Sequence, residues 1–499
     1  MQIHQVRVHP SKSPLPRTEQ LAWKLAQVAS DPVPVDADVA ELVIDRFIDN
    51  AAVAIAAINR APVVSARAMA LGHPRNDGAT IFGVHPAQRF SPEWAAWANG
   101  TAVRELDMHD TLLAADYSHP GDNIPPILAV TQTMKKSGSN FIAAVVAAYE
   151  IQIALVKAIA LHPHRIDHIA HLCPAQAAGV SAVLGLSVDT IYQAIQQAVH
   201  VSFTTRQSRK GEISSWKAFA PAHSGKLAIE AVDRAMRGEG APSPVYEGED
   251  SVIAWLLDGP DAQYEVSLPG PGEPKRAIMG SFSKEHSAEY QAQALIDLAF
   301  RMRTKIADLS TIEKVIIHTS HHTHSVIGTG ANDPQKFDPK ASRETLDHSA
   351  MYIFAVALQD GRWHHIESYK PERASRPDTV QLWRSIETRE DPAWTSRYLS
   401  PDPAQKAFGA RVEIFFKDGP TLEDQLLVAN AHPLGTKPFA RPGYIQKFQT
   451  LTDGIISSQE SERFLAAAQQ LPVLRAGDLH QLNVALPEQH LVQGRRGIF

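Results

Sequence analysis

Cysteine is almost absent from this chain of 499 residues. Its one cysteine, Cys173, allows neither an intrachain disulfide nor the three or four thiolates that hold an iron–sulfur cluster or a cysteine-only zinc site. So few thiols are typical of a reducing compartment, and we expect a cytoplasmic protein. Residues 1–18 carry charges and prolines but no apolar run, which predicts no signal peptide.

An excess of positive charge is also lacking. The 48 Lys and Arg residues are outnumbered by 54 Asp and Glu residues, and the two signs are well mixed. We therefore expect no nucleic-acid partner and no membrane partner. Residues 141–160 have the length of a membrane span, but Glu150, Gln152 and Lys157 interrupt them. That pattern favours a helix buried in an all-helical core.

Glycine-rich phosphate motifs are missing as well. The sequence has no GxGxxG after a strand, no GxxxxGK[ST] and no GxSxG. It therefore lacks the usual marks of a dinucleotide enzyme, a P-loop NTPase or a serine hydrolase.

The residues that are present predict a mainly helical first half and a mixed second half. Ala-rich helical patterns cover residues 39–59, 188–199 and 221–237, with few polar positions, so these helices are expected to pack on one another. LPGPGEP at residues 268–274 stops any helix and indicates a domain boundary. After it, residues 312–318 alternate partly as a strand, and residues 410–416 and 425–429 have the pattern of a hairpin.

The densest group of ionisable residues is ELDMHDTLLAADYSH, residues 105–119. It places Asp107, Thr111 and His119 in one short segment that leaves a helix and enters a loop rich in proline and glycine. Loops held by a rigid scaffold often carry catalytic groups. The alternative is a solvated loop with ordinary capping aspartates.

A second group is cationic and lies in residues 204–223. Arg206, Arg209, Lys210 and Lys217 fall within twelve residues, and arginine offers forked donors that match carboxylates. This pattern indicates a polyanionic small molecule as the ligand. A polar surface loop is the alternative, although Trp216 beside Lys217 favours partial burial.

A third group is rich in histidine. In an extended strand, His318, His322 and His324 would share one face, and a three-histidine zinc site is chemically feasible. The spacing lacks HExxH and no cysteine is near, so we favour a hydrogen-bonding strand end or loop over a metal site.

Long segments of the chain closely resemble the MmgE/PrpD family. They include NGTAVRELDMHDTLLAADYSHPGDNIPPILA, HIAHLCPAQAAG, TRQSRKGEISSWKAFAPAHSGKLAIEAVDRAMRGEGAP and SFSKEHSAEYQAQALIDLA. The resemblance implies a mainly α fold, with a large all-helical domain formed by both chain ends and a smaller α+β lid. We expect residues 1–275 and 433–499 in the helical domain and residues 276–432 in the lid. It further implies a homodimer and an active site without a cofactor or metal.

The resemblance also assigns site residues. The family's catalytic set corresponds to Asp107, Thr111, His119, His171, Lys217, Lys284 and Tyr352. His168 competes with His171, because the spacing to the following glycine differs from the family's. Decarboxylases of the family carry a histidine five residues after the lid lysine, whereas this chain has Glu289 there. This difference disfavours decarboxylation.

The activity implied by the resemblance is dehydration of 2-methylcitrate, a tricarboxylate, in propionate breakdown by the methylcitrate cycle. Such an elimination needs a base, an acid for the departing hydroxide and cations for the developing charge. We expect His119 or Asp107 as the base, one of His171, Lys284 and Tyr352 as the acid, and Arg206, Arg209, Lys210 and Lys217 as carboxylate ligands. The alternatives are a hydro-lyase for citrate or cis-aconitate, a metal-dependent hydrolase using residues 318–324, and a non-catalytic binding protein.

Overall fold

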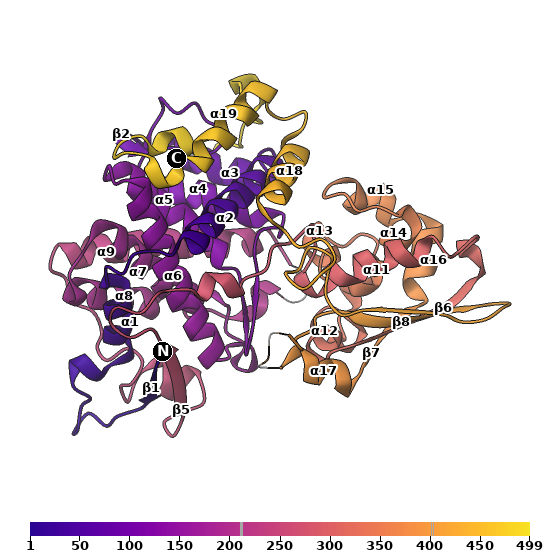
Figure 1. The fold of residues 1–499 in the computed structure, drawn as a ribbon, viewed down its shortest axis with the longest axis horizontal. Helices are drawn as coiled ribbons and strands as arrows, with labels where there is room; N and C mark the ends of the chain where they lie inside the picture. The colour runs from indigo at the N-terminus through magenta and orange to yellow at the C-terminus, as the bar shows by residue number, and fades with distance from the viewer. Residues whose placement is uncertain (210–212, 401, 403) are drawn as a thin grey trace.

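The computed structural model describes residues 1–209, 213–400, 402 and 404–499, which form two bodies lying side by side (Figure 1). Helices build the larger body. They are α1 (Leu21–Ser30), α2 (Ala37–Ala56), α3 (Ala61–Leu71), α4 (Pro92–Glu105), α5 (Ile124–Thr133), α6 (Gly138–Ala158), α7 (Ile169–Leu184), α8 (Val188–Ser202), α9 (Trp216–Met236), α10 (Val252–Leu256), α18 (Arg441–Thr452) and α19 (Ser458–Gln469).

Both ends of the chain contribute to the core of the larger body. The C-terminal helices α18 and α19 pack against α2, as their position beside it in Figure 1 shows. Phe47 of α2 lies between Phe141 of α6 and Phe464 of α19, at ring centroid distances of 6.1 and 5.9 Å. The apolar faces of helices far apart in the sequence are thus buried against one another, which is the main source of their stability.

Helix α6 covers most of residues 141–160, the segment with the length of a membrane span. Within the described residues it is the one helix long and apolar enough to span a membrane, and 83% of its most apolar stretch is buried in the protein. It packs against α7 and α5. The prediction of a buried core helix is confirmed.

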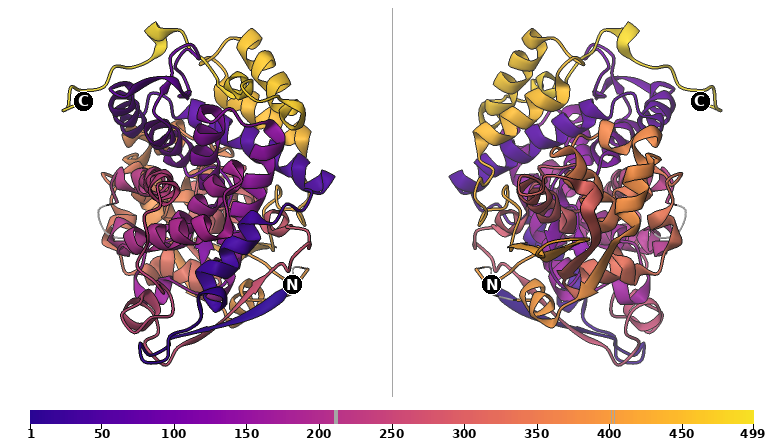
Figure 2. Two further views of the ribbon diagram at one scale, coloured as in Figure 1. Left: turned by 90° about the vertical axis from the view of Figure 1, so that its left-hand side faces the viewer. Right: turned by 90° about the vertical axis from the view of Figure 1, so that its right-hand side faces the viewer.

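The smaller body combines helices with a four-stranded sheet, which lies nearest the viewer in the right-hand view of Figure 2. The strand order is β7-β6-β8-β9, with β6 parallel to β7 and antiparallel to β8. The strands are β6 (Ile312–Thr319), β7 (Ile386–Glu390), β8 (Ala410–Phe416) and β9 (Leu422–Leu426). The helices are α11 (Gln293–Arg303), α12 (His321–Val326), α13 (Arg343–Leu346), α14 (Ala350–Asp360), α15 (Pro371–Ala374), α16 (Pro377–Arg384) and α17 (Pro392–Tyr398).

Short strands complete the fold. β1 (Gln2–Arg7) pairs antiparallel with β5 (Gln263–Leu268), and β3 (Leu112–Leu113) pairs with β4 (Tyr117–Ser118) in the loop after α4, while β2 (Pro74–Ala79) precedes α4. The mainly α prediction is confirmed. So is the hairpin, although β9 begins three residues before the predicted 425.

The segment predicted as a boundary lies against the larger body. Arg276 forms ion pairs with Asp36 and Asp38 at the start of α2, and Lys275 Nζ donates to Asp31 O at 2.9 Å. The chain therefore leaves the larger body beyond these contacts, close to the residues described next.

Candidate active site

The loop after α4 lies where the two bodies meet. Asp107 has a φ of 50°, in the left-handed region that residues other than glycine seldom occupy, so the chain turns sharply directly after the helix. Thr111 N donates to Phe282 O at 2.8 Å, and Phe282 N donates to Thr111 O at 2.7 Å. This backbone bridge holds the loop against the segment that carries Lys284.

Asp107 is the centre of a buried ion cluster. Its Oδ1 accepts from Lys284 Nζ at 2.8 Å and from Arg104, and its Oδ2 lies 3.1 Å from Lys217 Nζ. Burial alone would raise the pKa of the Asp107 carboxyl, but these three cations hold it well below its usual range. Asp107 is therefore ionised at neutral pH and is a weak base.

A second carboxylate, Asp347 of the smaller body, shares Lys217 with Asp107. Lys217 Nζ lies 2.9 Å from Asp347 Oδ1, and Arg343 donates to Asp347 Oδ2 at 3.1 Å. With Arg104 and Lys284, four cations surround two carboxylates, so each carboxylate is held by more than one cation.

The same two carboxylates and His348 also have the spacing of a metal-binding group. In this structure the Lys217 ammonium lies between Asp107 and Asp347, and His348 Nδ1 is bonded to Asp347. Lys217 thus supplies at this point the positive charge that a bridging metal ion would bring.

His119 is held in one tautomer by its neighbours. Its Nδ1 lies 3.0 Å from Asp110 O and 3.1 Å from Thr111 Oγ1. Because a carbonyl oxygen only accepts, we assign the proton to Nδ1, which leaves a lone pair on Nε2. Burial, together with the cations Arg104 and Lys284, lowers the pKa of His119 well below its usual value. The ring is therefore a neutral base at neutral pH.

Asp107 and His119 lie in the wall of a cavity of about 20 Å³ between the two bodies, hereafter the catalytic cavity. The larger body contributes Arg104, Asp107, Tyr117, His119, Arg206 and Arg209, and the smaller body contributes Glu289, His322, Val326 and His348. The volume has room for one or two water molecules. An organic substrate therefore requires the two bodies to move apart before it can bind.

Glu289 lies in the wall of the catalytic cavity and can carry an exchangeable proton. Burial raises the pKa of its carboxyl to about 7, although Lys284 works in the opposite direction. Both its protonated and its ionised form are populated at neutral pH. His348, also in the cavity wall, differs, because burial and Lys217 lower its pKa to about 4 and keep it neutral.

A wider cavity of about 370 Å³ adjoins the catalytic cavity and is called the vestibule here. Arg206, Arg209 and Val326 line both spaces, so they form the passage between them. Arg165 and Lys336 add positive charge to the vestibule, which therefore offers a cationic route inward. Of the cations predicted to bind the ligand, Lys210 lies outside the described residues.

Of the residues predicted as catalytic, His171 and Tyr352 neither line this cavity nor form a hydrogen bond with its lining. His171 Nε2 donates to Ile159 O at 2.9 Å within the larger body. Tyr352 lies in the core of the smaller body, where its OH donates to Ser368 O and its ring centroid is 4.9 Å from that of Trp383. Their positions do not support the assignment to the active site.

His168, the alternative to His171, lies closer to the cavity. Its ring centroid is 5.7 Å from that of His119, and its Nδ1 is 2.9 Å from Asp167 Oδ1. Asp167 also pairs with Arg209 at 3.1 Å. One buried carboxylate thus positions both a histidine beside the base and an arginine of the passage.

The histidine-rich segment does not form the three-histidine face that an extended strand would give. β6 ends at Thr319 and α12 begins at His321, so His318 and His322 lie on different elements. His318 Nε2 donates to Glu413 at 2.7 Å, and His324 Nδ1 contacts Thr388 Oγ1 at 2.7 Å. His322 instead reaches the catalytic cavity, where it stacks on Tyr398 at 5.2 Å. The three-histidine face does not form, because a Ser320 cap starts a helix there, whereas His318 lies at a hydrogen-bonded strand end as favoured from the sequence.

Sequence reasoning missed several residues of the site. Arg104 lies in the last turn of α4, and the smaller body adds Arg343, Asp347 and His348 from one short segment. Glu289 was noted only as a difference from the decarboxylases, and His322 only as a possible metal ligand. The adjacent charged pair Asp347-His348 is the signal that could have pointed to this part of the site.

Two family models match most of the chain. The model of the MmgE/PrpD N-terminal domain matches residues 19–265, and that of the MmgE/PrpD C-terminal domain matches residues 286–472. The chain belongs to the MmgE/PrpD family. Within this family it is similar to the 2-methylcitrate dehydratase of Salmonella typhimurium, with 26% identity over 79% of this chain and 83% of that protein.

Eukaryotic relatives within the MmgE/PrpD family show a similar likeness. The mitochondrial 2-methylcitrate dehydratase of Yarrowia lipolytica is 26% identical over 76% of this chain and 74% of that protein. A fungal protein named alkylcitrate dehydratase phiI is 25% identical over 68% of each chain.

Proposed function

We propose that this protein is a hydro-lyase that removes water from 2-methylcitrate to give 2-methyl-cis-aconitate. The observation that carries the proposal is the catalytic cavity, in which a neutral histidine and a carboxyl with a raised pKa lie among buried cations. The names of the family relatives, which are dehydratases of 2-methylcitrate or of an alkylcitrate, support this substrate class.

In the proposed reaction His119 is the base. Its Nε2 takes the proton from the carbon next to a substrate carboxylate, while Nδ1 keeps its proton toward Asp110 O. The electron pair of the broken C–H bond forms the carbon–carbon double bond. Cations at the cavity stabilise the negative charge that gathers on the adjacent carboxylate, and their effect is strong because water is excluded.

Glu289 is the acid in this proposal. As the carbon–oxygen bond breaks, the Glu289 carboxyl gives its proton to the departing hydroxyl, which leaves as water. Lys284 was one of the acids expected from the sequence. It is instead bonded to both the side chain and the backbone carbonyl of Asp107, at 2.8 and 2.9 Å, so we assign it to holding Asp107.

Arg206 and Arg209 hold substrate carboxylates at the passage from the vestibule. Arg209 is fixed by Asp167, and Arg206 donates to the hydroxyl of Tyr117, so both guanidinium groups are positioned before substrate arrives. Preorganised forked donors suit carboxylates better than mobile lysines do. The bodies must separate to admit the substrate and close again to exclude water.

The lining of the catalytic cavity also bears on the size of the substituent that the substrate carries. Val326 is the one aliphatic side chain among the described residues that line the catalytic cavity, so the cavity suits a short substituent such as methyl. Citrate and cis-aconitate, which lack the methyl group, are the alternative substrates. One methyl in an apolar pocket is worth about 1–3 kcal/mol, so a side activity on them is expected.

Three further parts of the proposal rest on the sequence. They are a cytoplasmic location, assembly as a homodimer, and catalysis by side chains without a metal or cofactor. The scarcity of cysteine supports a cytoplasmic location, because it is typical of a reducing compartment. The single cysteine also supports catalysis without a metal cluster, because it cannot supply the thiolates that such a cluster needs.

The experiment is an absorbance assay of the purified protein for the conjugated product. We expect turnover of 2-methylcitrate with kcat/KM about 10 to 100 times that for citrate, the ratio that one buried methyl provides. An Arg209→Lys variant should raise KM, because lysine lacks the forked geometry. Absence of turnover with both substrates would contradict the proposal.

A further inference from the structure

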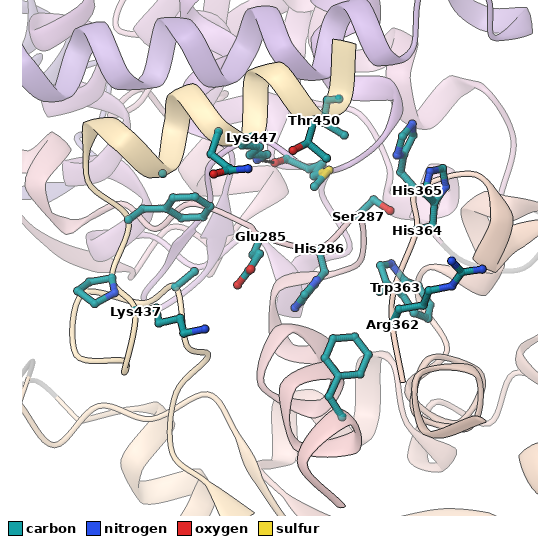
Figure 3. Close-up of a pocket in the computed structure, with 18 of the residues that line it drawn as sticks. Glu285, His286, Ser287, Arg362, Trp363, His364, His365, Lys437, Lys447 and Thr450 are labelled. Carbon is teal, nitrogen blue, oxygen red and sulfur yellow. Dashed lines mark hydrogen bonds between the residues drawn. The ribbon is translucent and has the colours of Figure 1, made fainter. Parts of the chain in front are cut away.

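A cavity of about 650 Å³ is separate from the catalytic cavity and its vestibule. It lies between the two bodies beside α18 and is called the α18 pocket here (Figure 3). Met108 and α18 form its wall on the larger body, and residues 285–287, 361–365 and 431–439 belong to its opposite side. Its volume is typical of sites for small organic molecules.

One side of the α18 pocket presents hydrogen-bond donors. The hydroxyl of Ser287 and Nε1 of Trp363 are buried and have no hydrogen-bond partner among the described residues. His364 Nδ1 accepts from the backbone N–H groups of Ile366 and Glu367, both at 3.1 Å, so its proton lies on Nε2. The Ser287 and Trp363 donors are closed to solvent, so the ring N–H of the exposed His364 is the donor of this wall that a ligand can reach.

Positive charge accompanies these donors. Arg362 follows Gly361 in the same loop, and its side chain makes no ion pair within the described part of the chain. Figure 3 shows Arg362, Trp363, His364 and Ser287 on one side of the pocket and Glu285 on the other. An anion would therefore be drawn to the Arg362 side, because Glu285 offsets the charge of Lys437 on the other side.

The rest of the lining is largely apolar. Phe300 belongs to the smaller body, and Met108 belongs to the loop after α4. Phe439 precedes α18, and Leu451 belongs to it. From these contacts we propose that the α18 pocket binds a small organic carboxylate with an apolar body. The carboxylate lies against Arg362 and His364, and the apolar body lies against the aromatic side chains.

The pocket is joined to the catalytic cavity through two pairs of adjacent residues. Asp107 and Lys284 belong to the catalytic cluster, whereas the residues after them, Met108 and Glu285, line the α18 pocket. Lys447 of α18 donates to Met108 O and to Lys284 O, both at 2.7 Å, and so ties the two segments together. A carboxylate in the pocket therefore changes the stability of the catalytic cluster.

The test is calorimetric titration of the whole protein with octanoate, which has a carboxylate and an apolar body of suitable size. We expect one binding site, and Arg362→Met should weaken its Kd at least about tenfold, as loss of one charge-assisted hydrogen bond does. Lys437→Met is the matched control, because this lysine lines the same pocket on the side of Glu285. It should change the Kd less than about threefold.

Two further measurements define the site. 1-Octanol, which lacks the charge, should bind at least about tenfold more weakly than octanoate. His119→Gln should bind octanoate as the unsubstituted protein does, because His119 belongs to the catalytic cavity. Absence of octanoate binding, or a Kd insensitive to Arg362→Met, would overturn the proposal. Loss of binding in His119→Gln would overturn it too, because the carboxylate would then occupy the catalytic cavity.

Discussion

The two spaces between the bodies differ in how their charges are satisfied. In the catalytic cavity every cation of the Asp107 cluster has a carboxylate partner within about 3 Å. In the α18 pocket, Arg362 lacks an ion pair among the described residues. The first space is small and the second is more than an order of magnitude larger.

This difference separates chemistry from binding. A closed cluster of paired charges holds each group in the position that a reaction requires, with little reorganisation. An open pocket with unsatisfied donors gains its stabilisation only when a ligand arrives. Substitutions in the catalytic cavity should therefore change turnover, whereas those in the α18 pocket should change ligand affinity. The predictions below test this division, beginning with the largest expected effect.

His119→Gln should lower kcat/KM by about 1000-fold, within the range for loss of a general base. Glutamine keeps a donor toward Asp110 O but offers no basic nitrogen. His109→Gln is the control, since His109 lies in the same loop but bonds to Asp122 at 3.0 Å. Its effect should be much milder. The reverse order in steady-state assays would show that the base is misassigned.

Lys217→Ala should lower kcat/KM by at least about 100-fold while the protein still folds. Asp107 keeps Arg104 and Lys284 as partners, and Asp347 keeps Arg343, so no carboxylate is left unpaired.

The control for this variant is Lys226→Ala on the same helix, α9, where the lysine pairs with Glu230 near the surface. Thermal unfolding checks the fold of both variants. Near-native turnover of Lys217→Ala would mean that the anion site lies elsewhere.

Glu289→Gln should lower kcat/KM about 10- to 100-fold and remove one limb of its pH profile. Burial raises the pKa of Glu289 to about 7, so the protonated acid, and with it kcat/KM, declines as the pH rises through about 7. An amide does not titrate, so the variant should show no such decline. If the decline near pH 7 persisted in Glu289→Gln, the proton would come from another group.

Arg362→Met should change the free energy of unfolding by less than about 0.5 kcal/mol, as exposed substitutions usually do. Its guanidinium has no ion partner within the described residues. Denaturant unfolding measures the change. Arg343→Met is the comparison, because it removes a buried partner of Asp347 and should cost several times more. Equal costs would contradict the contrast between paired and unpaired charges.

Prolonged EDTA treatment should leave activity within about twofold, because side chains supply the charges that a metal would bring. In the catalytic cavity Lys217 lies between Asp107 and Asp347. Beside the α18 pocket, the group formed by Glu285, His286 and Asp297 also has metal-binding spacing, and His286 is bonded there to Asp297 at 3.0 Å. Activity lost to EDTA and restored by zinc would show that a metal takes part.

The sequence by itself determined the mainly α fold, the hairpin and the family. These depend on local patterns: buried helices are rich in apolar residues, and β8 and β9 are separated by a short turn at Asp418-Gly419. Long motifs also identified the loop of Asp107 and His119 and the lysines Lys217 and Lys284, because each motif is continuous in the chain.

Only the tertiary structure decided which of these residues meet. Asp107 and Asp347 are 240 positions apart, yet one lysine bridges them, and no local pattern records that contact. Burial likewise decided which group carries a proton, since the raised pKa of Glu289 depends on desolvation and not on its neighbours in sequence. Tyr352 shows the converse. The family resemblance assigned it to the active site, but packing against Trp383 buries it in the smaller body's core. A pKa and a cavity depend on what packs around a residue, and that is fixed by the whole fold.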